Sequence, residues 1–137
     1  MIGMDYDLAS ADNTWTGKFY VHKSFQEDDS KGNYSSQARL NFNSRYWNFA
    51  TDWAYVDEEF RADLGFVPRT GVFKSGNNIS YTLYPKKGSV NTHSIELANL
   101  AYFKPDLDWK QIDDSWALAY QINFKDQSEI ALVGTYD

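Results

Sequence analysis

The stretch from Ser44 to Arg69 carries the clearest pattern of the chain, an alternation of two kinds of side chain. One set consists of Trp47, Phe49, Thr51, Trp53 and Tyr55, and the intervening set of Tyr46, Asn48, Ala50, Asp52 and Ala54. A period of two over ten residues predicts a β-strand, because a helix would spread the aromatic residues around its circumference. One face of this strand is bulky and apolar, and the other is small or polar and carries a charge.

The same period recurs along the chain and predicts about eight strands in a single domain, residues 1–137. The predicted strands cover residues 2–8, 15–25, 38–42, 46–55, 79–84, 92–103, 116–124 and 130–136. The sixth is the least distinctive, because the segment SIELANLAYF is also compatible with a short helix. The expected fold class is all-β, an antiparallel up-and-down meander that forms a transmembrane β-barrel or a segment of a larger one.

The bulky face could be covered in two ways. A water-soluble sandwich buries its apolar face against a second sheet, whereas a membrane barrel turns that face to lipid. The predicted connections favour the barrel, because they alternate in length. The shorter ones are 10–13, 43–44, 85–90 and 125–128, and the longer ones are 26–35, 57–78 and 104–114. Outer-membrane barrels have short turns on the periplasmic side and long loops on the outer side.

This sorting of the connections also predicts where the two ends of the chain lie. With the short turns in the periplasm, both ends are expected on the outer side of the membrane, which favours a segment of a larger barrel. Closure of the eight strands on themselves is the alternative. The opening MIGMDYDLAS lacks the basic and apolar regions of a signal peptide, so we expect a piece of a longer precursor.

Composition excludes several classes of protein. No apolar run approaches the roughly 20 residues of a membrane helix, and the mean hydropathy is −0.61. The net charge of −6 argues against a nucleic-acid partner, since such proteins are normally basic. There is no cysteine, and neither His22 nor His93 has metal-ligand spacing. We therefore expect no enzyme activity, no metal and no cofactor.

Acidic runs are the remaining candidates for chemistry. They lie at 27–30, 57–59 and 106–114, and they could bind calcium or act on a glycoside. None has the spacing of a known calcium loop, and acidic loops are usually only solvated.

Charged residues on the polar face are the candidate lumen lining. They are Lys18, Arg39, Arg45, Asp52 and Glu96, with Asp5, Asp7 and Glu129 on the same face. One interpretation is a lumen of mixed charge that filters or binds a polar solute. The other is that opposite charges pair with one another inside a narrow barrel. Asp52 with Arg39 or Arg45 on the neighbouring strand is the first pair expected.

The aromatic residues also have two interpretations. Trp15, Trp47, Trp53, Tyr55 and Trp116 are candidates for the lipid-facing surface or for the aromatic girdles at its borders. Trp15, Tyr55 and Trp116 lie near predicted strand ends, as girdles require. Alternatively, Trp47, Trp53 and Tyr55 form a sugar-stacking platform on a soluble carbohydrate-binding module.

The segment FRADLGFVPRTG, between the aromatic strand and ISYTLYPK, resembles the C-terminal barrel of domain-of-unknown-function family 5916. The shared motif is Gly65, Phe66, Val67, Pro68 and Arg69. This resemblance implies the outer membrane of Gram-negative bacteria and a large barrel behind a carbohydrate-binding-like sandwich, and we expect no such sandwich within residues 1–137. It implies no reaction.

Gly65, Phe66, Pro68 and Arg69 are expected to play a structural role. Gly65 permits a bend, Pro68 removes a ladder donor, and Arg69 could anchor a loop folded into the lumen. The expected function is a scaffold or passage for a polar solute, related to oligosaccharides. The expected partners are the lipid bilayer or detergent and a polar small molecule or oligosaccharide.

Overall fold

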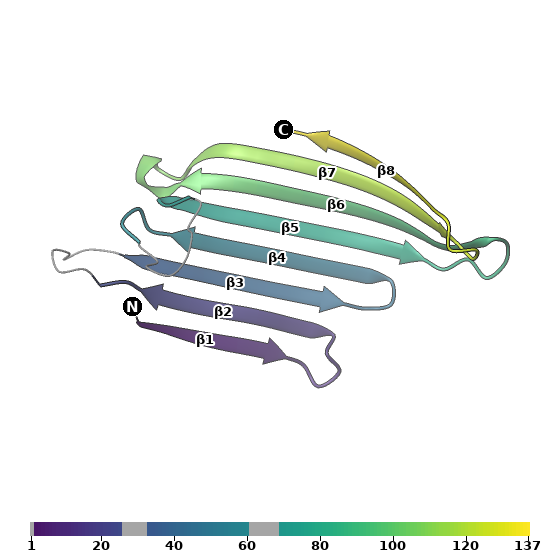
Figure 1. Ribbon diagram of the computed structural model, residues 1–137, viewed down its shortest axis with the longest axis horizontal. Coiled ribbons are helices and arrows are strands. Elements are labelled where there is room, and N and C mark those ends of the chain that lie inside the picture. Colours follow the sequence, from purple (N-terminus) through teal and green to yellow (C-terminus); the bar gives the residue numbers. More distant parts are fainter. Residues whose placement is uncertain (1, 26–32, 61–68) are drawn as a thin grey trace.

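The fold is a single antiparallel sheet of eight strands in chain order (Figure 1). The computed structural model describes residues 2–25, 33–60 and 69–137. The strands are β1 (Ile2–Ala9), β2 (Trp15–Lys23), β3 (Tyr34–Asn43), β4 (Trp47–Val56), β5 (Val72–Leu83), β6 (Val90–Lys104), β7 (Lys110–Phe124) and β8 (Glu129–Tyr136). A 3-10 turn, η1 (Pro105–Leu107), joins β6 to β7. The predicted all-β, up-and-down meander is confirmed.

Five strands begin earlier in the chain than the alternation predicted, and three of them begin at least four residues earlier. β5 starts at Val72 rather than 79, and β3 and β7 start at Tyr34 and Lys110. The added segment of β5 reads VFKSGNN, whose glycine and asparagines have a low preference for strands. Backbone pairing with β4 on one side and β6 on the other holds this segment extended. The helical alternative for SIELANLAYF is excluded, because these residues lie in β6.

The predicted alternation of short and long connections is wrong at the sixth one. That connection spans only residues 105–109 and is shorter than the fifth, residues 84–89. β6 and β7 continue as a hairpin, which Pro105 and two left-handed residues close, Asp108 with φ 54° and Trp109 with φ 59°. The tight turn places residues 110–114 in a strand instead of a loop.

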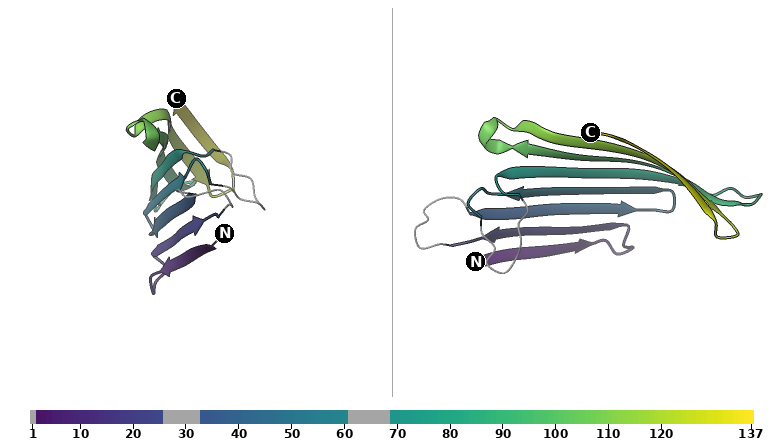
Figure 2. Two further views of the ribbon diagram at one scale, coloured as in Figure 1. Left: turned by 90° about the vertical axis from the view of Figure 1, so that its left-hand side faces the viewer. Right: turned by 45° about the horizontal axis from the view of Figure 1, so that its top comes forward.

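The sheet is open and forms one layer. β1 and β8 are its two edge strands, and the views in Figure 2 show the sheet twisted and bent into an arc. Phe60, Val72 and Ala101 are the only buried apolar residues in the described ranges. No helix in the described part of the chain is long and apolar enough to cross a membrane. The fold therefore has two large faces and almost no interior.

Strand register gives the two faces opposite chemistry. Residues directly opposite one another on neighbouring strands share a face. One row consists of Trp15, Phe42, Phe49, Ile79, Leu97 and Leu118. A row on the other side consists of Asp7, Lys18, Arg39, Asp52 and Gly76. We call these sides the apolar face and the polar face.

The turn between β1 and β2 is organised by the carboxylate of Asp12. Ser10 Oγ donates to Asp12 Oδ1 at 2.6 Å, and Thr14 donates from its backbone N at 3.0 Å and from its hydroxyl at 2.6 Å. These hydrogen bonds to the ionised form lower the pKa of Asp12 to about 2. The turn is thus built for a charged carboxylate.

We predict that Asp12→Asn destabilises the β1–β2 hairpin in a pH-dependent way. Because the folded pKa lies below the usual value, the stabilisation by Asp12 is complete above about pH 4 and disappears as pH falls through about 2. Denaturant midpoints of wild type and variant should therefore differ at pH 7 and converge near pH 2. A difference that is independent of pH would contradict the assignment.

Candidate functional site

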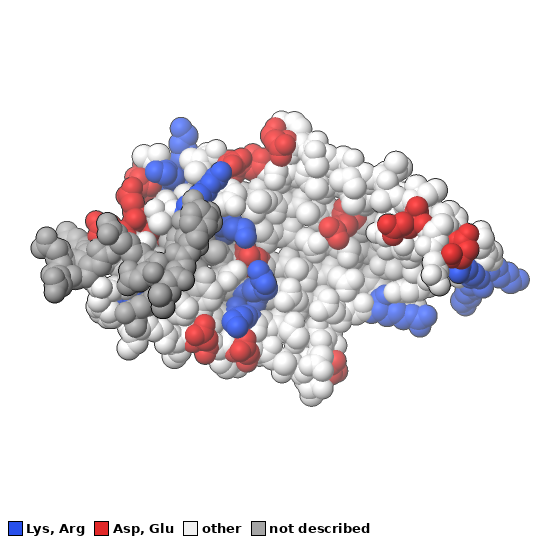
Figure 3. All heavy atoms as spheres, in the orientation of Figure 1, with Lys and Arg blue, Asp and Glu red and all other residues white. Residues whose placement is uncertain are grey.

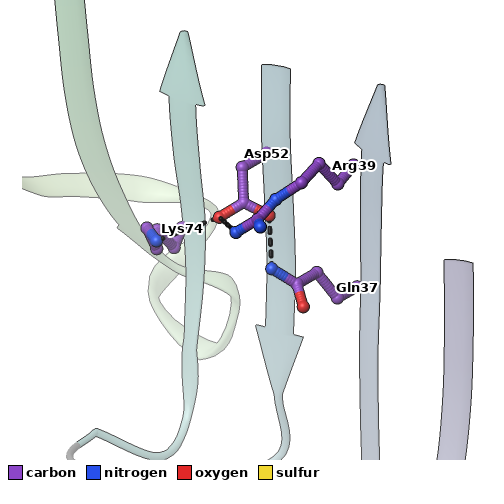
Figure 4. A network of polar contacts seen from close by, with 4 residues as sticks. All are labelled: Gln37, Arg39, Asp52 and Lys74. Atoms are coloured by element: carbon purple, nitrogen blue, oxygen red, sulfur yellow. Dashed lines mark hydrogen bonds and ion pairs between the residues drawn. The ribbon is translucent and has the colours of Figure 1, made fainter. Parts of the chain in front are cut away.

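Four polar side chains from three adjacent strands meet on the polar face (Figure 4). They are Gln37 and Arg39 of β3, Asp52 of β4 and Lys74 of β5. Lys74 Nζ lies 3.1 Å from Asp52 Oδ2, and Arg39 Nη2 lies 3.4 Å from the same oxygen. Gln37 Nε2 donates to Asp52 Oδ1. We call these residues the Asp52 cluster.

Asp52 is the centre of this cluster because both of its carboxylate oxygens are occupied. Its side chain is 18% exposed, against 54% for Arg39 and 36% for Lys74. Removing a carboxylate from water is costly unless cations and hydrogen-bond donors replace the water. Three donors from two flanking strands supply that compensation. The predicted pair of Arg39 with Asp52 is confirmed.

Arg45 does not belong to the Asp52 cluster, so its predicted pairing with Asp52 is wrong. It lies in the turn between β3 and β4, outside both strands. Its guanidinium carbon is 5.4 Å from the ring centre of Tyr46 and 5.3 Å from that of Tyr84. Strand alternation cannot place a residue beyond the strand end, and there the two rings offer a cation–π contact.

Other predicted charges on the polar face, those of Lys18 and Glu96, do not belong to the Asp52 cluster. Lys18 Nζ lies 3.8 Å from Asp7 Oδ1, and both side chains are largely exposed. Glu96 lies opposite Ser80 and Ala119, with no basic partner among the described residues. Basic and acidic side chains are intermingled over the surface seen in Figure 3.

The remaining polar-face candidates pair locally. Glu129 accepts a hydrogen bond from Gln121 at 3.1 Å, and His22 Nε2 lies 3.5 Å from Asp5 Oδ1. His93 lies on the apolar face, where its Nδ1 is 2.8 Å from the Tyr120 hydroxyl. No group of three metal-ligating side chains comes together within residues 2–25, 33–60 and 69–137.

Beside the Asp52 cluster the polar face is hollowed. The hollow has a volume of about 540 Å³, and Gly76 lies in it directly opposite Asp52 and Leu100. Its lining includes Arg39, Asn41, Asp52, Lys74, Asn78 and Tyr102. The sequence analysis singled out Arg39 and Asp52 only. Gly76 and Asn78 were missed because they lie in the part of β5 that does not alternate. Asn41 lies in the alternating part of β3 and was passed over because it carries no charge.

Aromatic pairs border the apolar face at both ends of the strands. At the end with the β3–β4 turn, ring centres lie 4.9 Å apart for Trp15 and Phe42, and 4.5 Å apart for Trp47 and Tyr81. At the other end, Phe73 lies 6.2 Å from Phe103. Phe73 and Tyr81 are about 27 Å apart along β5 at the usual strand rise.

The predicted aromatic candidates occupy different places on this face. Trp15 begins β2 and Tyr55 lies near the end of β4. Trp53 lies further inside β4, opposite Ala38 and Ser75. Trp116 is not near a strand end as predicted, because β7 begins at Lys110; it lies opposite Asn99 and Tyr136.

A polar strip crosses the middle of the apolar face, and the sequence analysis did not detect it. Thr51 Oγ1 donates to Asn77 Oδ1 at 2.8 Å, and Asn77 Nδ2 donates to Ser75 Oγ at 3.1 Å. Asn99, opposite Asn77, donates to the Ser115 backbone carbonyl at 3.3 Å. The only sign of this strip in the sequence was Thr51, a polar residue among the aromatic residues of the alternating segment. These side chains satisfy one another or the backbone locally.

Of the predicted structural motif, Gly65, Phe66 and Pro68 lie outside the described residues. Arg69 is described: its Nη1 lies 3.4 Å from Asp113 Oδ2, and its guanidinium carbon is 4.8 Å from the ring centre of Tyr102. Arg69 thus contacts β6 and β7, far from it in sequence. The acidic run 27–30 also lies outside the described residues.

No family model, curated protein or solved structure matches this chain. The resemblance to domain-of-unknown-function family 5916 therefore stays a prediction.

We predict that Asp52→Asn lowers the free energy of unfolding by about 1–2 kcal/mol, because Arg39 and Lys74 then face each other without their carboxylate. Asp7→Asn is the matched control. Its side chain is 75% exposed, and such surface pairs contribute about 0–1 kcal/mol. Denaturant unfolding of both variants measures the difference, and equal losses would refute a special role for Asp52.

Proposed function

We propose that this chain forms part of the wall of a transmembrane β-barrel in a bacterial outer membrane. The apolar face contacts lipid, and the polar face lines a passage for a polar solute. The observation that carries the proposal is a sheet of eight strands whose apolar face is exposed from edge to edge. Exposing an apolar surface of this size to water is unfavourable. Lipid can cover it without a second layer of protein.

The borders of the apolar face support this orientation. Trp15 and Trp47 lie at one end, and Tyr55 and Phe73 at the other. Aromatic rings with a polar edge are favourable at the two membrane–water interfaces, which flank an apolar band about 25 Å tall. The spacing of about 27 Å along β5 is of that size before any tilt of the strand.

The polar face supports an aqueous lumen. Its charges pair across neighbouring strands, as in the ion pairs of Lys18 with Asp7 and of Arg39 with Asp52. Charged side chains are stabilised by water or by an opposite charge, and an aqueous lumen provides the first where pairing does not. The hollow at Gly76 leaves space for a solute. An oligosaccharide fits this lining by chemistry, since amide and charged side chains bind hydroxyl groups.

One observation favours a second candidate function, a soluble module that binds carbohydrate on the apolar face. The polar strip of Thr51, Ser75 and Asn77 lies beside Trp53, whose side chain is about half exposed. A tryptophan face next to amide and hydroxyl groups can hold a sugar by stacking and hydrogen bonding.

The first experiment is refolding of the chain with and without detergent or lipid vesicles. We expect folding to require detergent or lipid, with heat-dependent gel mobility and a blue shift of tryptophan emission on adding vesicles. Trp53→Phe should reduce that shift, because Trp53 lies on the apolar face. A monodisperse, cooperatively unfolding protein in plain buffer would contradict the membrane proposal and favour the second candidate.

Two adjacent residues of β7 provide a sharper test of orientation. Leu118 lies on the apolar face and is 52% exposed, whereas Ala119 lies on the polar face. In vesicles, Leu118→Lys should lower stability by about 2–4 kcal/mol, the cost of a cation on the lipid side. Ala119→Lys should cost less than about 1 kcal/mol. Denaturant unfolding in vesicles measures both, and the reverse order would overturn the orientation.

A further inference from the structure

The hollow at Gly76 has the shape of a binding subsite. Gly76 contributes no side chain, and a Cβ atom there would make no contact closer than 3.7 Å: it would meet the Asp52 backbone oxygen at 3.7 Å, Leu100 Cδ1 at 3.8 Å and Lys74 Cε at 4.0 Å. The volume of about 540 Å³ lies within the range of small-molecule sites, about 300–1,000 Å³. A larger side chain at position 76 would occupy this space.

The charges around the hollow are biased toward the cations. Arg39 and Lys74 oppose the single carboxylate of Asp52 within the cluster. Both Asp52 oxygens already accept hydrogen bonds or ion pairs, and its side chain is the least exposed of the three. The charged groups that the hollow exposes are therefore mainly the Arg39 guanidinium and the Lys74 ammonium. This local surplus contrasts with the net charge of −6 of the whole chain.

Arg39 has capacity for a second anion. Its guanidinium carries five N–H donors, and within the described residues its one polar contact is Nη2 with Asp52 Oδ2 at 3.4 Å. A planar guanidinium binds a carboxylate through two parallel hydrogen bonds. Lys74 Nζ, on the other side of Asp52, adds a second positive charge.

The remaining lining residues suit hydroxyl groups. Asn41 and Asn78 line the same hollow and both offer an amide donor and acceptor. Tyr102 adds an aromatic ring to the lining, with Arg69 at 4.8 Å from its centre. Cations for a carboxylate, amides for hydroxyls and a ring for a sugar face together specify an acidic saccharide.

We propose that the hollow at Gly76 binds the uronate unit of an acidic oligosaccharide, with Arg39 and Lys74 on its carboxylate and Asn41 and Asn78 on its hydroxyls. This inference rests on the proposed function, because it names the solute class of the same polar face. Asp52 acts as a positioning residue that fixes the two cations at the edge of the hollow.

The test is calorimetric titration of the full chain, folded in detergent micelles, with trigalacturonate and with maltotriose as the neutral probe. Wild type should bind trigalacturonate at least about tenfold more tightly than maltotriose. Arg39→Gln should weaken trigalacturonate binding about tenfold and leave maltotriose unchanged. Lys86→Gln is the matched control, since it removes an equal charge from the exposed β5–β6 connection. Gly76→Phe should abolish binding of both probes by filling the hollow.

Three results would overturn the inference: equal affinity for the two probes, equal losses in Arg39→Gln and Lys86→Gln, or no detectable trigalacturonate binding by the folded wild type. Circular dichroism and heat-dependent gel mobility of each variant check that it folds. The proposed function is measured separately by vesicle insertion. Insertion without trigalacturonate binding would refute only the acidic-saccharide site. Binding by a protein that folds in plain buffer would refute only the membrane orientation.

Discussion

A single layer of strands cannot bury either of its own faces, and the rest of this structure depends on that constraint. The backbone is satisfied by pairing within the sheet, from β1 at one edge to β8 at the other. The apolar side chains are not buried within the sheet, and residues such as Leu97 and Leu118 stay substantially exposed. In an ordinary domain the hydrophobic effect joins two layers around a core. Here it must act between the sheet and its surroundings.

The polar face solves the opposite problem. A carboxylate between two strands needs donors from both sides, and Asp52 finds them in Gln37, Arg39 and Lys74. The cluster links β3, β4 and β5 across the polar face. It also leaves two cations partly exposed beside a hollow. One set of interactions thus supports the sheet and shapes the surface beside the hollow.

The polar strip on the apolar face shows how the two faces are linked. Thr51, Asn77 and Ser75 form a chain of hydrogen bonds, so their polarity is largely satisfied within the sheet. Thr51 is buried between larger neighbours. Asn77 and Asn78 are neighbours in β5 and project to opposite faces, one into the strip and one toward the hollow. The segment of β5 that alternates least is therefore the one that serves both faces.

The sequence by itself determined the period, and the period determined the fold class. Strict alternation around Trp47, Phe49 and Trp53 admits only a strand with two unlike faces, and repeating it gives the meander. It also placed Asp52, Arg39 and Arg45 on one face and predicted that Asp52 pairs with one of the two arginines, which the structure shows to be Arg39. Local pattern sufficed because consecutive antiparallel strands are neighbours in space.

Only the tertiary structure decided what depends on pairing between strands. The VFKSGNN segment is a strand because β4 and β6 flank it, not because its residues prefer that state. Lys74 joins the Asp52 cluster through that pairing, and Gly76 opens the hollow beside it. Arg45 lies outside the cluster because it sits in the β3–β4 turn, where it contacts the rings of Tyr46 and Tyr84. The sequence pattern could not predict these contacts, because the register between strands, rather than spacing along the chain, brings the groups together.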